Sequence, residues 1–198
     1  GCAEPFVAVP ALTRAAARAG AHIIENCAVR TLEYTGGQVT GVVTEQGAIN
    51  TGAVLLAGGA WSSDFAANAG FDLPQLSVRS TVGRTNPAPA RDLPNVSAPG
   101  FAVRQRVDGG YTVTSADLAE HYIGPKSLKY ATKFLPVLRL ASKDMRLLPK
   151  PPKGYPGSWG NLRGWRGDEQ SPFERMSVLN PTPSQTVIKR VAERLPTY

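Results

Sequence analysis

The most uniformly apolar stretch of the chain is residues 53–57 (AVLLA). This run is too short for a free-standing helix and too uniform for a half-exposed strand, so it predicts a strand buried on both faces. Gly58 and Gly59 follow directly, and two glycines allow the backbone to turn sharply. One of the serines at 62–63 can then cap a helix that ends before Gly70.

Helical and alternating patterns precede this stretch. Residues 10–19 (PALTRAAARA), followed by Gly20, predict a helix with proline in its first turn. Residues 22–34 are β-like, Gly36-Gly37 indicates a hairpin turn, and residues 38–45 (QVTGVVTE) form the return strand. The chain then turns once more into a short strand, so the pattern predicts a β-meander that leads into the buried strand.

After Gly70 the pattern is typical of an antiparallel sheet with helices. The predicted elements are a strand over 76–85, a hairpin of strands 101–107 and 111–115, a helix over 127–148 kinked at Pro136, and a helix from Pro183 to Leu195. A long loop over 149–172, rich in glycine, proline, tryptophan and arginine, indicates a cover or an interface. Together these elements predict an α+β fold.

Composition excludes several classes of protein. The 198 residues are 42% hydrophobic and 19% charged, and no apolar run approaches the length of a membrane span. No secretory signal pattern is present at the N-terminus. Cys2 and Cys27 are the only cysteines, and His22 and His121 are far apart in sequence, so we expect neither a zinc site nor a disulfide framework.

The net charge of +7 raises the question of an anionic partner. Much of the basic excess lies between Lys126 and Arg166, on a predicted solvated helical face and a loop. No nucleic-acid-binding signature accompanies it, so we do not expect a nucleic-acid partner.

The glycine turn at Gly58-Gly59 has two interpretations. A strand, a glycine turn and a helix start form the arrangement that α/β proteins use to hold an anionic cofactor. A tight turn whose glycines serve only packing would have the same sequence. The residues of the turn leave both interpretations open.

The order of a helix (PALTRAAARAGA), a strand (ENCAVRTLE), a hairpin (GGQVTGVVTEQG) and the segment AVLLAGGAWS resembles the D-amino-acid-oxidase-like family of FAD-dependent oxidoreductases. This family includes glycine oxidase, sarcosine oxidase and D-amino-acid dehydrogenases. The resemblance is strong from Cys2 to Pro74 and softer through DGGYTVTSA and SPFERMSVLNPTP. It implies a partial α/β FAD-binding domain with a β-meander over 1–72, and an antiparallel-sheet substrate-binding domain with helices over 73–198.

The resemblance also implies residues for the cofactor and the substrate. The backbone of Val29 would lie against the adenine end of FAD, although Val29 would equally suit the core of a strand. The backbone at Ala57, Gly58 and Gly59 would pass beside the dinucleotide, and Trp61 would help to close that wall.

Four residues of the predicted substrate domain could meet a substrate carboxylate, since arginine offers it a planar, bidentate fork. Surface or interstrand positions would explain the same residues without a substrate. They are Arg79, Arg84, Arg104 and Tyr111.

The sequence departs from the family pattern at both ends. It contains neither the GxGxxG unit with its acidic partner nor a C-terminal glycine-rich flavin-binding segment. We therefore expect an internal segment of a longer cytoplasmic flavoenzyme, inactive alone and binding FAD weakly or not at all. The parent protein would oxidise an amino acid or secondary amine by hydride transfer to the flavin. The alternative is a non-catalytic fragment, or a subunit of a split enzyme, that binds the missing halves or a second subunit.

Overall fold

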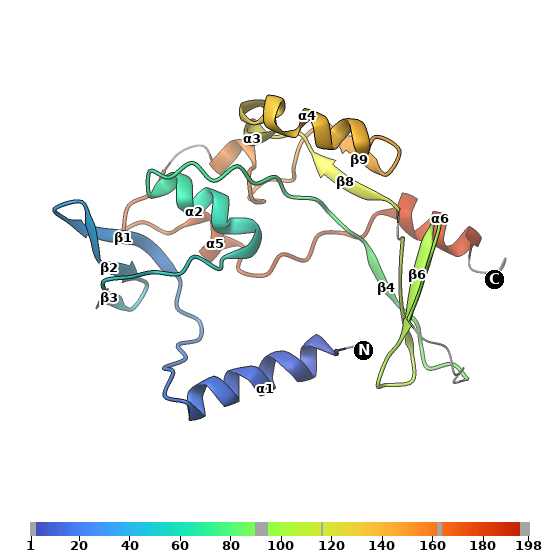
Figure 1. Ribbon diagram of the computed structural model, residues 1–198, viewed down its shortest axis with the longest axis horizontal. Coiled ribbons are helices and arrows are strands. Elements are labelled where there is room, and N and C mark those ends of the chain that lie inside the picture. The colour runs from blue at the N-terminus through green and yellow to red at the C-terminus, as the bar shows by residue number, and fades with distance from the viewer. Residues whose placement is uncertain (1–2, 90–94, 116, 162–163, 195–198) are drawn as a thin grey trace. The chain divides into compact units, whose positions relative to one another are not determined.

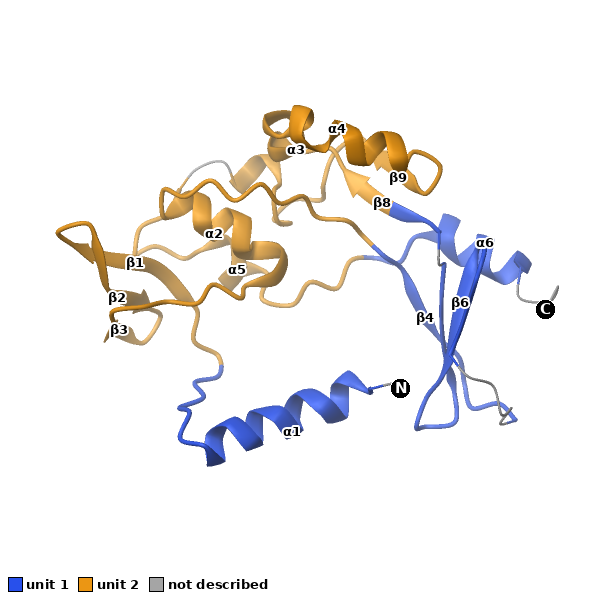
Figure 2. Cartoon of the chain, in the orientation of Figure 1, with its two compact units in different colours: residues 1–25, 80–119, 182–198 blue, residues 26–79, 120–181 orange. Residues whose placement is uncertain are grey.

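The computed structural model describes residues 3–89, 95–115, 117–161 and 164–194 (Figure 1). The chain forms two compact units, which Figure 2 distinguishes by colour. Unit 1 comprises residues 1–25, 80–119 and 182–198, and unit 2 comprises residues 26–79 and 120–181. The units are defined by packing, which does not show where ligands bind. The predicted division at residue 72, into a flavin part and a substrate part, therefore stays a prediction.

Unit 1 contains a four-stranded antiparallel sheet in the order β4-β7-β6-β5. Helix α6 (Gln185–Arg194) packs Val187 and Val191 against Val113 of this sheet, and these three residues form the core cluster of the unit. The predicted last helix is therefore confirmed, and its Ile188 is 42% exposed. The strands are β4 (Val82–Arg84), β5 (Val96–Ala98), β6 (Phe101–Gln105) and β7 (Tyr111–Thr114).

The hairpin of β6 and β7 is confirmed, and its turn explains why it forms. Gly109 has φ +81°, which glycine adopts without strain, and the Asp108 carboxylate accepts a hydrogen bond from the backbone N–H of Gly110. The turn places Val103 opposite Val113, on the face that packs against α6.

Helix α1 (Pro5–Arg18) also belongs to unit 1, and it begins earlier than the sequence pattern predicted. Pro5 occupies the first turn, where the absence of an N–H costs nothing, and Pro10 lies inside the helix. The predicted helix is confirmed and its predicted start is wrong. Gly20, with φ +97°, follows its end.

Unit 2 contains the predicted meander as a three-stranded antiparallel sheet, β1 (Val29–Thr35), β2 (Gln38–Thr44) and β3 (Gly47–Asn50). Gly36 and Gly37 both have positive φ, as the tight turn between twisted strands requires. The strand predicted over 22–34 begins only at Val29.

The buried strand predicted at residues 53–57 is wrong. The segment has no strand structure, and Leu55 is 92% exposed. A strand buried on both faces needs neighbouring strands and covering layers, and none of the described strands pairs with this segment. Instead it leads into a short 3₁₀ helix, η1 (Gly59–Trp61), and then α2 (Ser62–Asn68).

Helix α2 is confirmed, and its predicted serine cap is wrong. Ser62 and Ser63 lie inside the helix, and the residue at the N-cap position, Trp61, makes no side-chain capping hydrogen bond. The turn of η1 runs directly into α2, so the first N–H groups of α2 follow a backbone that is already helical. Gly70, with φ +84°, follows the helix as predicted.

The single helix predicted over 127–148 is divided. Helices α3 (Pro125–Lys129) and α4 (Ala131–Leu140) are followed by strand β9 (Met145–Leu148), which pairs with β8 (Ala119–Tyr122). Met145 and Leu148 have the spacing of one helical face in the sequence, but pairing with β8 uses this segment as a strand. In the strand predicted over 76–85, only β4 is regular, and Arg79 instead bridges to Glu120.

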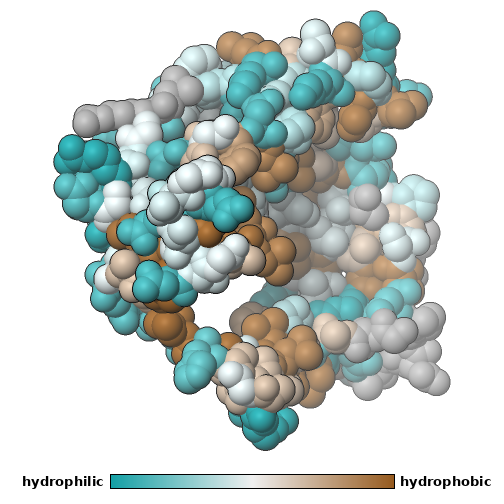
Figure 3. Space-filling model, turned by 60° about the vertical axis from the view of Figure 1, so that its left-hand side comes forward, coloured by the Kyte–Doolittle hydropathy of each residue, from teal (hydrophilic) through white to brown (hydrophobic). Residues whose placement is uncertain are grey.

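The long loop predicted over 149–172 is confirmed as largely irregular in residues 149–161 and 164–172. It contains η2 (Trp159–Asn161) and leads into α5 (Pro172–Arg175). Large apolar side chains are exposed on several elements, and Figure 3 shows the apolar surface in brown among the polar atoms. The most exposed include Phe6, Leu12, Leu55 and Leu140.

Candidate functional site

An apolar pocket of about 300 Å³ lies in unit 2 beside the glycine turn. Strand β1, the extended segment before η1, helix α2 and helix α5 all contribute to it. None of the described residues that line this pocket carries a charge. They are Ala28, Val29, Val54, Leu55, Leu56, Ala57, Gly58, Trp61, Phe65 and Phe173.

The structure brings together most of the predicted cofactor residues. Val29, Ala57, Gly58 and Trp61 all line this one pocket, although Val29 lies on a different element from the other three. Gly59 is not among the lining residues, but its φ of +55° makes the turn that carries the backbone from Gly58 into η1. The prediction that these residues hold FAD is a matter of function, and it stays a prediction.

Phe173 completes the pocket, and the sequence patterns did not reveal it. Its ring lies edge-on to Trp61 at 6.1 Å and to Trp165 at 5.6 Å between centroids, and it lies 6.3 Å from Phe65. Such edge-to-face pairs contribute beyond the area that they bury. The aromatic character of the predicted loop at 149–172 was a signal, but Phe173 lies just beyond that range and no local pattern linked it to the glycine turn.

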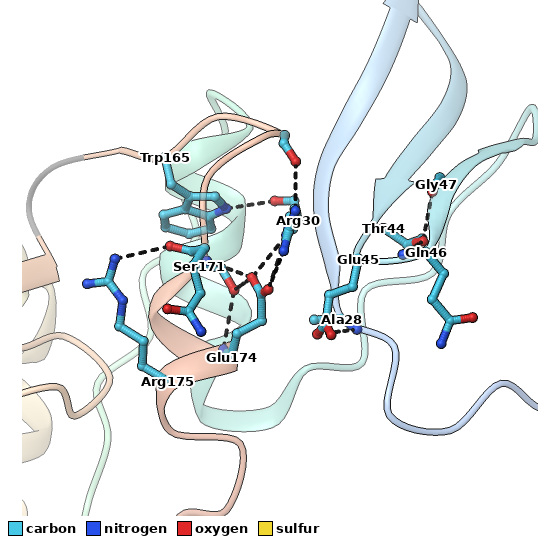
Figure 4. Close-up of polar contacts among 12 residues, drawn as sticks. Ala28, Arg30, Thr44, Glu45, Gln46, Gly47, Trp165, Ser171, Glu174 and Arg175 are labelled. Carbon is cyan, nitrogen blue, oxygen red and sulfur yellow. Dashed lines mark hydrogen bonds and ion pairs between the residues drawn. The ribbon is translucent and has the colours of Figure 1, made fainter.

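Figure 4 shows how the segment that carries Phe173 is fixed to strand β1. The guanidinium of Arg30 donates hydrogen bonds to both carboxylate oxygens of Glu174, with Nη2 2.7 Å from Oε1. The indole Nε1 of Trp165 donates to the backbone carbonyl of Arg30 at 2.8 Å. Contacts to both the side chain and the backbone of Arg30 therefore hold this wall of the pocket.

A capping box at the start of α5 supports the same carboxylate. The hydroxyl of Ser171 accepts a hydrogen bond from the backbone N–H of Glu174, and the Glu174 carboxylate accepts one from the Ser171 N–H at 2.6 Å. Burial by itself would raise the pKa of Glu174. The hydrogen bonds from Arg30 and Ser171 outweigh burial and hold that pKa below its usual range.

The pocket fits a flat, largely apolar group. The Nε1 of Trp61 is buried without a hydrogen-bond partner in the described part of the chain. FAD carries two flat ring systems, adenine and isoalloxazine. The uncharged lining does not suit the pyrophosphate, whose place would be at backbone N–H groups.

The four predicted substrate residues are divided between the two units. Arg79 belongs to unit 2, where its guanidinium pairs with the carboxylate of Glu120 and lies 5.2 Å from the Tyr122 ring centroid. Glu120 is 1% exposed, and Arg146 pairs with its other oxygen. Arg79 is thus committed to a buried carboxylate of its own chain.

The other three substrate candidates lie on the sheet of unit 1. Thr112 of β7 pairs with Arg84 of β4 on one side and with Arg104 of β6 on the other, so the three side chains share one face of the sheet. This face is opposite to that of Val113, which packs against α6. The hydroxyl of Tyr111 donates to the carbonyl of Pro89.

The two arginines of this row have different counter-ions. Arg104 donates to both carboxylate oxygens of Glu4, at 3.0 and 3.3 Å, and both side chains are largely buried. Arg84 pairs with Asp108 at 3.0 Å, and both side chains are at least half exposed. Exposed pairs contribute at most about 1 kcal/mol, so a ligand would displace Asp108 more easily than Glu4.

The basic helical face predicted over 126–146 is not simply solvated. The ammonium group of Lys126 contacts Ser63 and the buried carboxylate of Asp64, and Arg146 pairs with buried Glu120. The Asp64 carboxylate also accepts a hydrogen bond from the backbone N–H of Gly157 at 3.0 Å. The contacts of Lys126 and Gly157 with Asp64 hold α3 and the loop after β9 to α2, so that prediction is wrong for Lys126. The side chain of Arg146 is 48% exposed, as predicted.

A second apolar pocket, of about 290 Å³, lies in unit 2 under α3 and α4. Its polar members, His121 and Ser127, hydrogen-bond to each other, and the other His121 nitrogen lies 2.8 Å from the carbonyl of Ser77. With both ring nitrogens occupied, His121 has a structural role here.

Residues 1–175 match the family described as "DAO: FAD dependent oxidoreductase". The chain therefore belongs to this family, and the resemblance and the cofactor of the family, FAD, are confirmed. Among solved structures, the chain is similar to L-amino acid deaminase from Proteus vulgaris over 98% of its length, with a TM-score of 0.84 and 31% identity. The deaminase from Proteus myxofaciens, solved with anthranilate, gives a TM-score of 0.85 and 33% identity over the same share. The mixed fold of helices and antiparallel sheets is likewise confirmed.

The chain spans only part of each relative. It covers 45% and 43% of the two Proteus deaminases. It is 33% identical to mouse mitochondrial sarcosine dehydrogenase over 115 residues, which are 55% of this chain and 12% of the relative. It is 47% identical to sarcosine oxidase subunit beta from Arthrobacter sp. over 64 residues, which are 32% of this chain and 16% of the relative.

None of the helices in the described residues is long and apolar enough to cross a membrane. The predicted cytoplasmic location is a separate matter and stays a prediction.

Proposed function

We propose that this chain is part of a flavoenzyme that oxidises an amino acid or a secondary amine by hydride transfer to FAD. The observation that carries the proposal is the single apolar pocket at the glycine turn, lined by Val29, Ala57, Gly58 and Trp61. Relatives named as sarcosine dehydrogenase and L-amino acid deaminase support the substrate class. Bound flavin would supply the electron acceptor, and the protein would supply position and electrostatics.

The residues of this chain would hold and orient one ring of the cofactor. The β1 backbone at Val29 would lie along one side of the ring, and the turn at Ala57 to Gly59 would lie along another. Phe173, fixed through the Arg30–Glu174 pair, would form the third side and exclude water. The pyrophosphate and the remaining ring would need donors from elsewhere in the complete protein.

For the substrate carboxylate, the proposal favours Arg84 and then Arg104. Both lie in one row on the sheet face that α6 leaves uncovered, and Arg104 already binds a carboxylate, that of Glu4, in bidentate fashion. Arg79 is less suited because removing it from Glu120 would leave a buried carboxylate with less compensation. Tyr111 lies on the other face of the sheet from Arg84.

The test is to produce the protein at its complete natural length and record its visible spectrum. We expect flavin absorbance that is bleached anaerobically by an amino acid or by sarcosine. Substituting Arg84→Lys should raise the KM for a carboxylate-bearing amine and leave the flavin spectrum unchanged. A correctly folded, colourless protein that takes up no FAD would refute the proposal.

A second candidate function is a partner-binding module, either alone or as a subunit of a split enzyme. The observation in its favour is α4, none of whose residues is buried and on which Leu140 is 87% exposed. Size-exclusion chromatography of the 198-residue chain tests this candidate, since self-association favours the module. Titration with FAD tests the other, since micromolar binding favours the flavoenzyme part and would contradict the expectation that the chain alone binds FAD weakly.

A further inference from the structure

Arg30 lies next to the pocket residue Val29, at an irregular point of strand β1. Val29 pairs with Thr44 of β2 and Thr31 pairs with Val43, so Arg30 is the extra residue of a β-bulge. A strand bends at a bulge, and the extra residue can turn toward another part of the chain. The carbonyl and the side chain of Arg30 both contact a segment more than 130 residues further along the sequence.

Residues 164–175 are this segment, and Arg30 contacts them at three points (Figure 4). Its carbonyl accepts a hydrogen bond from Trp165, its Nη1 donates to the carbonyl of Gly167 at 3.3 Å, and its guanidinium binds both carboxylate oxygens of Glu174. The side chains of Arg30 and Glu174 are only 21% and 6% exposed, so water competes little for their hydrogen bonds. One residue of β1 therefore holds the beginning, the middle and the end of the segment.

The segment is also attached closely on both sides of the pocket. A Cβ at Gly167 would lie 3.1 Å from the hydroxyl oxygen of Thr31 in β1, which is closer than an ordinary van der Waals contact. On α2, the side-chain amide of Asn68 exchanges two hydrogen bonds with the backbone of Trp165, at 2.9 and 3.1 Å. Between these attachments and Glu174 the segment carries Phe173, which lines the pocket.

We propose that Arg30 is a positioning residue for the cofactor pocket, which acts through Phe173 by holding residues 164–175 in place. The inference rests on the proposed function. Arg30 itself is not among the described residues that line the pocket. A wall that is already in place costs less ordering when the ligand binds, so losing its attachment weakens the affinity. Because coupling between two equilibria is reciprocal, bound FAD must stabilise the attached segment by the same factor.

The first test measures the Kd for FAD in the complete apoprotein. Arg30→Met keeps an apolar stem and removes the guanidinium, and we expect the Kd to rise about tenfold. Arg166→Met makes the same chemical change in the same segment, at a side chain that is 74% exposed and does not line the pocket, so the Kd should stay unchanged. In a Phe173→Leu background, which already lacks the aromatic wall, Arg30→Met should raise the Kd by less than about twofold.

Hydrogen–deuterium exchange separates positioning from a purely structural role. Saturating FAD should slow the exchange of backbone amides in residues 164–175 of the wild-type protein, including the Trp165 N–H that donates to Asn68. This protection should be smaller in Arg30→Met.

Three results would each overturn the role of Arg30 and leave the proposed function standing. They are an unchanged Kd in Arg30→Met, an equal loss of affinity in the Phe173→Leu background, and exchange in residues 164–175 that FAD does not slow. Wild-type protein that binds no FAD would refute both.

Discussion

Gly58 and Gly59 are neighbours, but they place different demands on the backbone. Gly59 has φ +55°, a conformation that L-residues adopt only with strain, and a Cβ there would meet no atom within 4 Å. Gly58 has φ −77°, and a Cβ there would make ordinary contacts of 3.4 to 3.7 Å with Ser62 and Leu56. Gly59 is therefore required by its backbone conformation. Only a ligand could require glycine at position 58.

Gly59→Ala is expected to lower the free energy of unfolding by about 1 to 2 kcal/mol through backbone strain alone. Gly58→Ala is the matched control, and it should change stability by less than about 0.5 kcal/mol. Urea denaturation of the two variants checks this expectation. If Gly58→Ala keeps its stability but loses affinity for FAD, the space beside Gly58 belongs to the cofactor.

Glu174 gives a prediction for pH. Its pKa is lower in the folded protein than in the unfolded chain, so its ionised form stabilises the fold above a pH of about 4.3, and this contribution disappears as the pH falls through the folded-state pKa. Glu174→Gln should therefore cost roughly 1 to 3 kcal/mol at pH 7 and less at pH 3. Denaturation at the two pH values measures the difference.

The control for this experiment is Glu193→Gln. Glu193 is 64% exposed and lies 4.0 Å from Lys189 on the surface of α6, so its loss should cost less than about 0.5 kcal/mol at either pH. An equal effect of both variants at pH 7 would contradict the role given to Glu174.

At the scale of elements, α2, α3 and the loop after β9 are joined by one buried carboxylate. Asp64 of α2 is 5% exposed, and it receives Lys126 of α3 together with the Gly157 N–H and the Asn161 amide. Because α2 follows directly from η1, this joint also holds the pocket wall.

Asp64→Asn is expected to destabilise unit 2 by roughly 3 kcal/mol, because it leaves the charge of Lys126 largely buried without its counter-ion. Asp144→Asn, at an exposed position, is the control and should be near neutral. Thermal unfolding followed by tryptophan fluorescence measures both. A neutral Asp64→Asn would show that the joint carries no stability.

The elements that the sequence predicted well are those whose cause is local. The turns at Gly36-Gly37 and Asp108 to Gly110 determine their hairpins within a few residues. Residues 53–57 and 145–148 were predicted incorrectly because strand formation depends on partners far along the chain. For the same reason the pocket was predicted only in part. The glycine turn can be recognised in the sequence, whereas no local pattern links Phe173 to that turn.

For the whole molecule, the division into two units makes their stabilities separately measurable. All three tryptophans, Trp61, Trp159 and Trp165, lie in unit 2, so their fluorescence reports on that unit. The core of unit 1 is centred on Val187, which is 1% exposed.

Val187→Ala is expected to destabilise unit 1 by about 2 kcal/mol through a cavity in its core. Far-UV circular dichroism should then show a transition at lower denaturant concentration, while the fluorescence transition of unit 2 stays in place. A joint shift of both signals would show that the two units unfold together.

The pair between Arg30 and Glu174 joins positions 144 residues apart. During synthesis, the ribosome delivers β1 and the glycine turn long before it delivers α5, at a rate of about 5 to 20 residues per second. For several seconds the nascent chain would hold a glycine turn whose pocket has no Phe173 wall. Cofactor capture in this protein would therefore be a late step of folding.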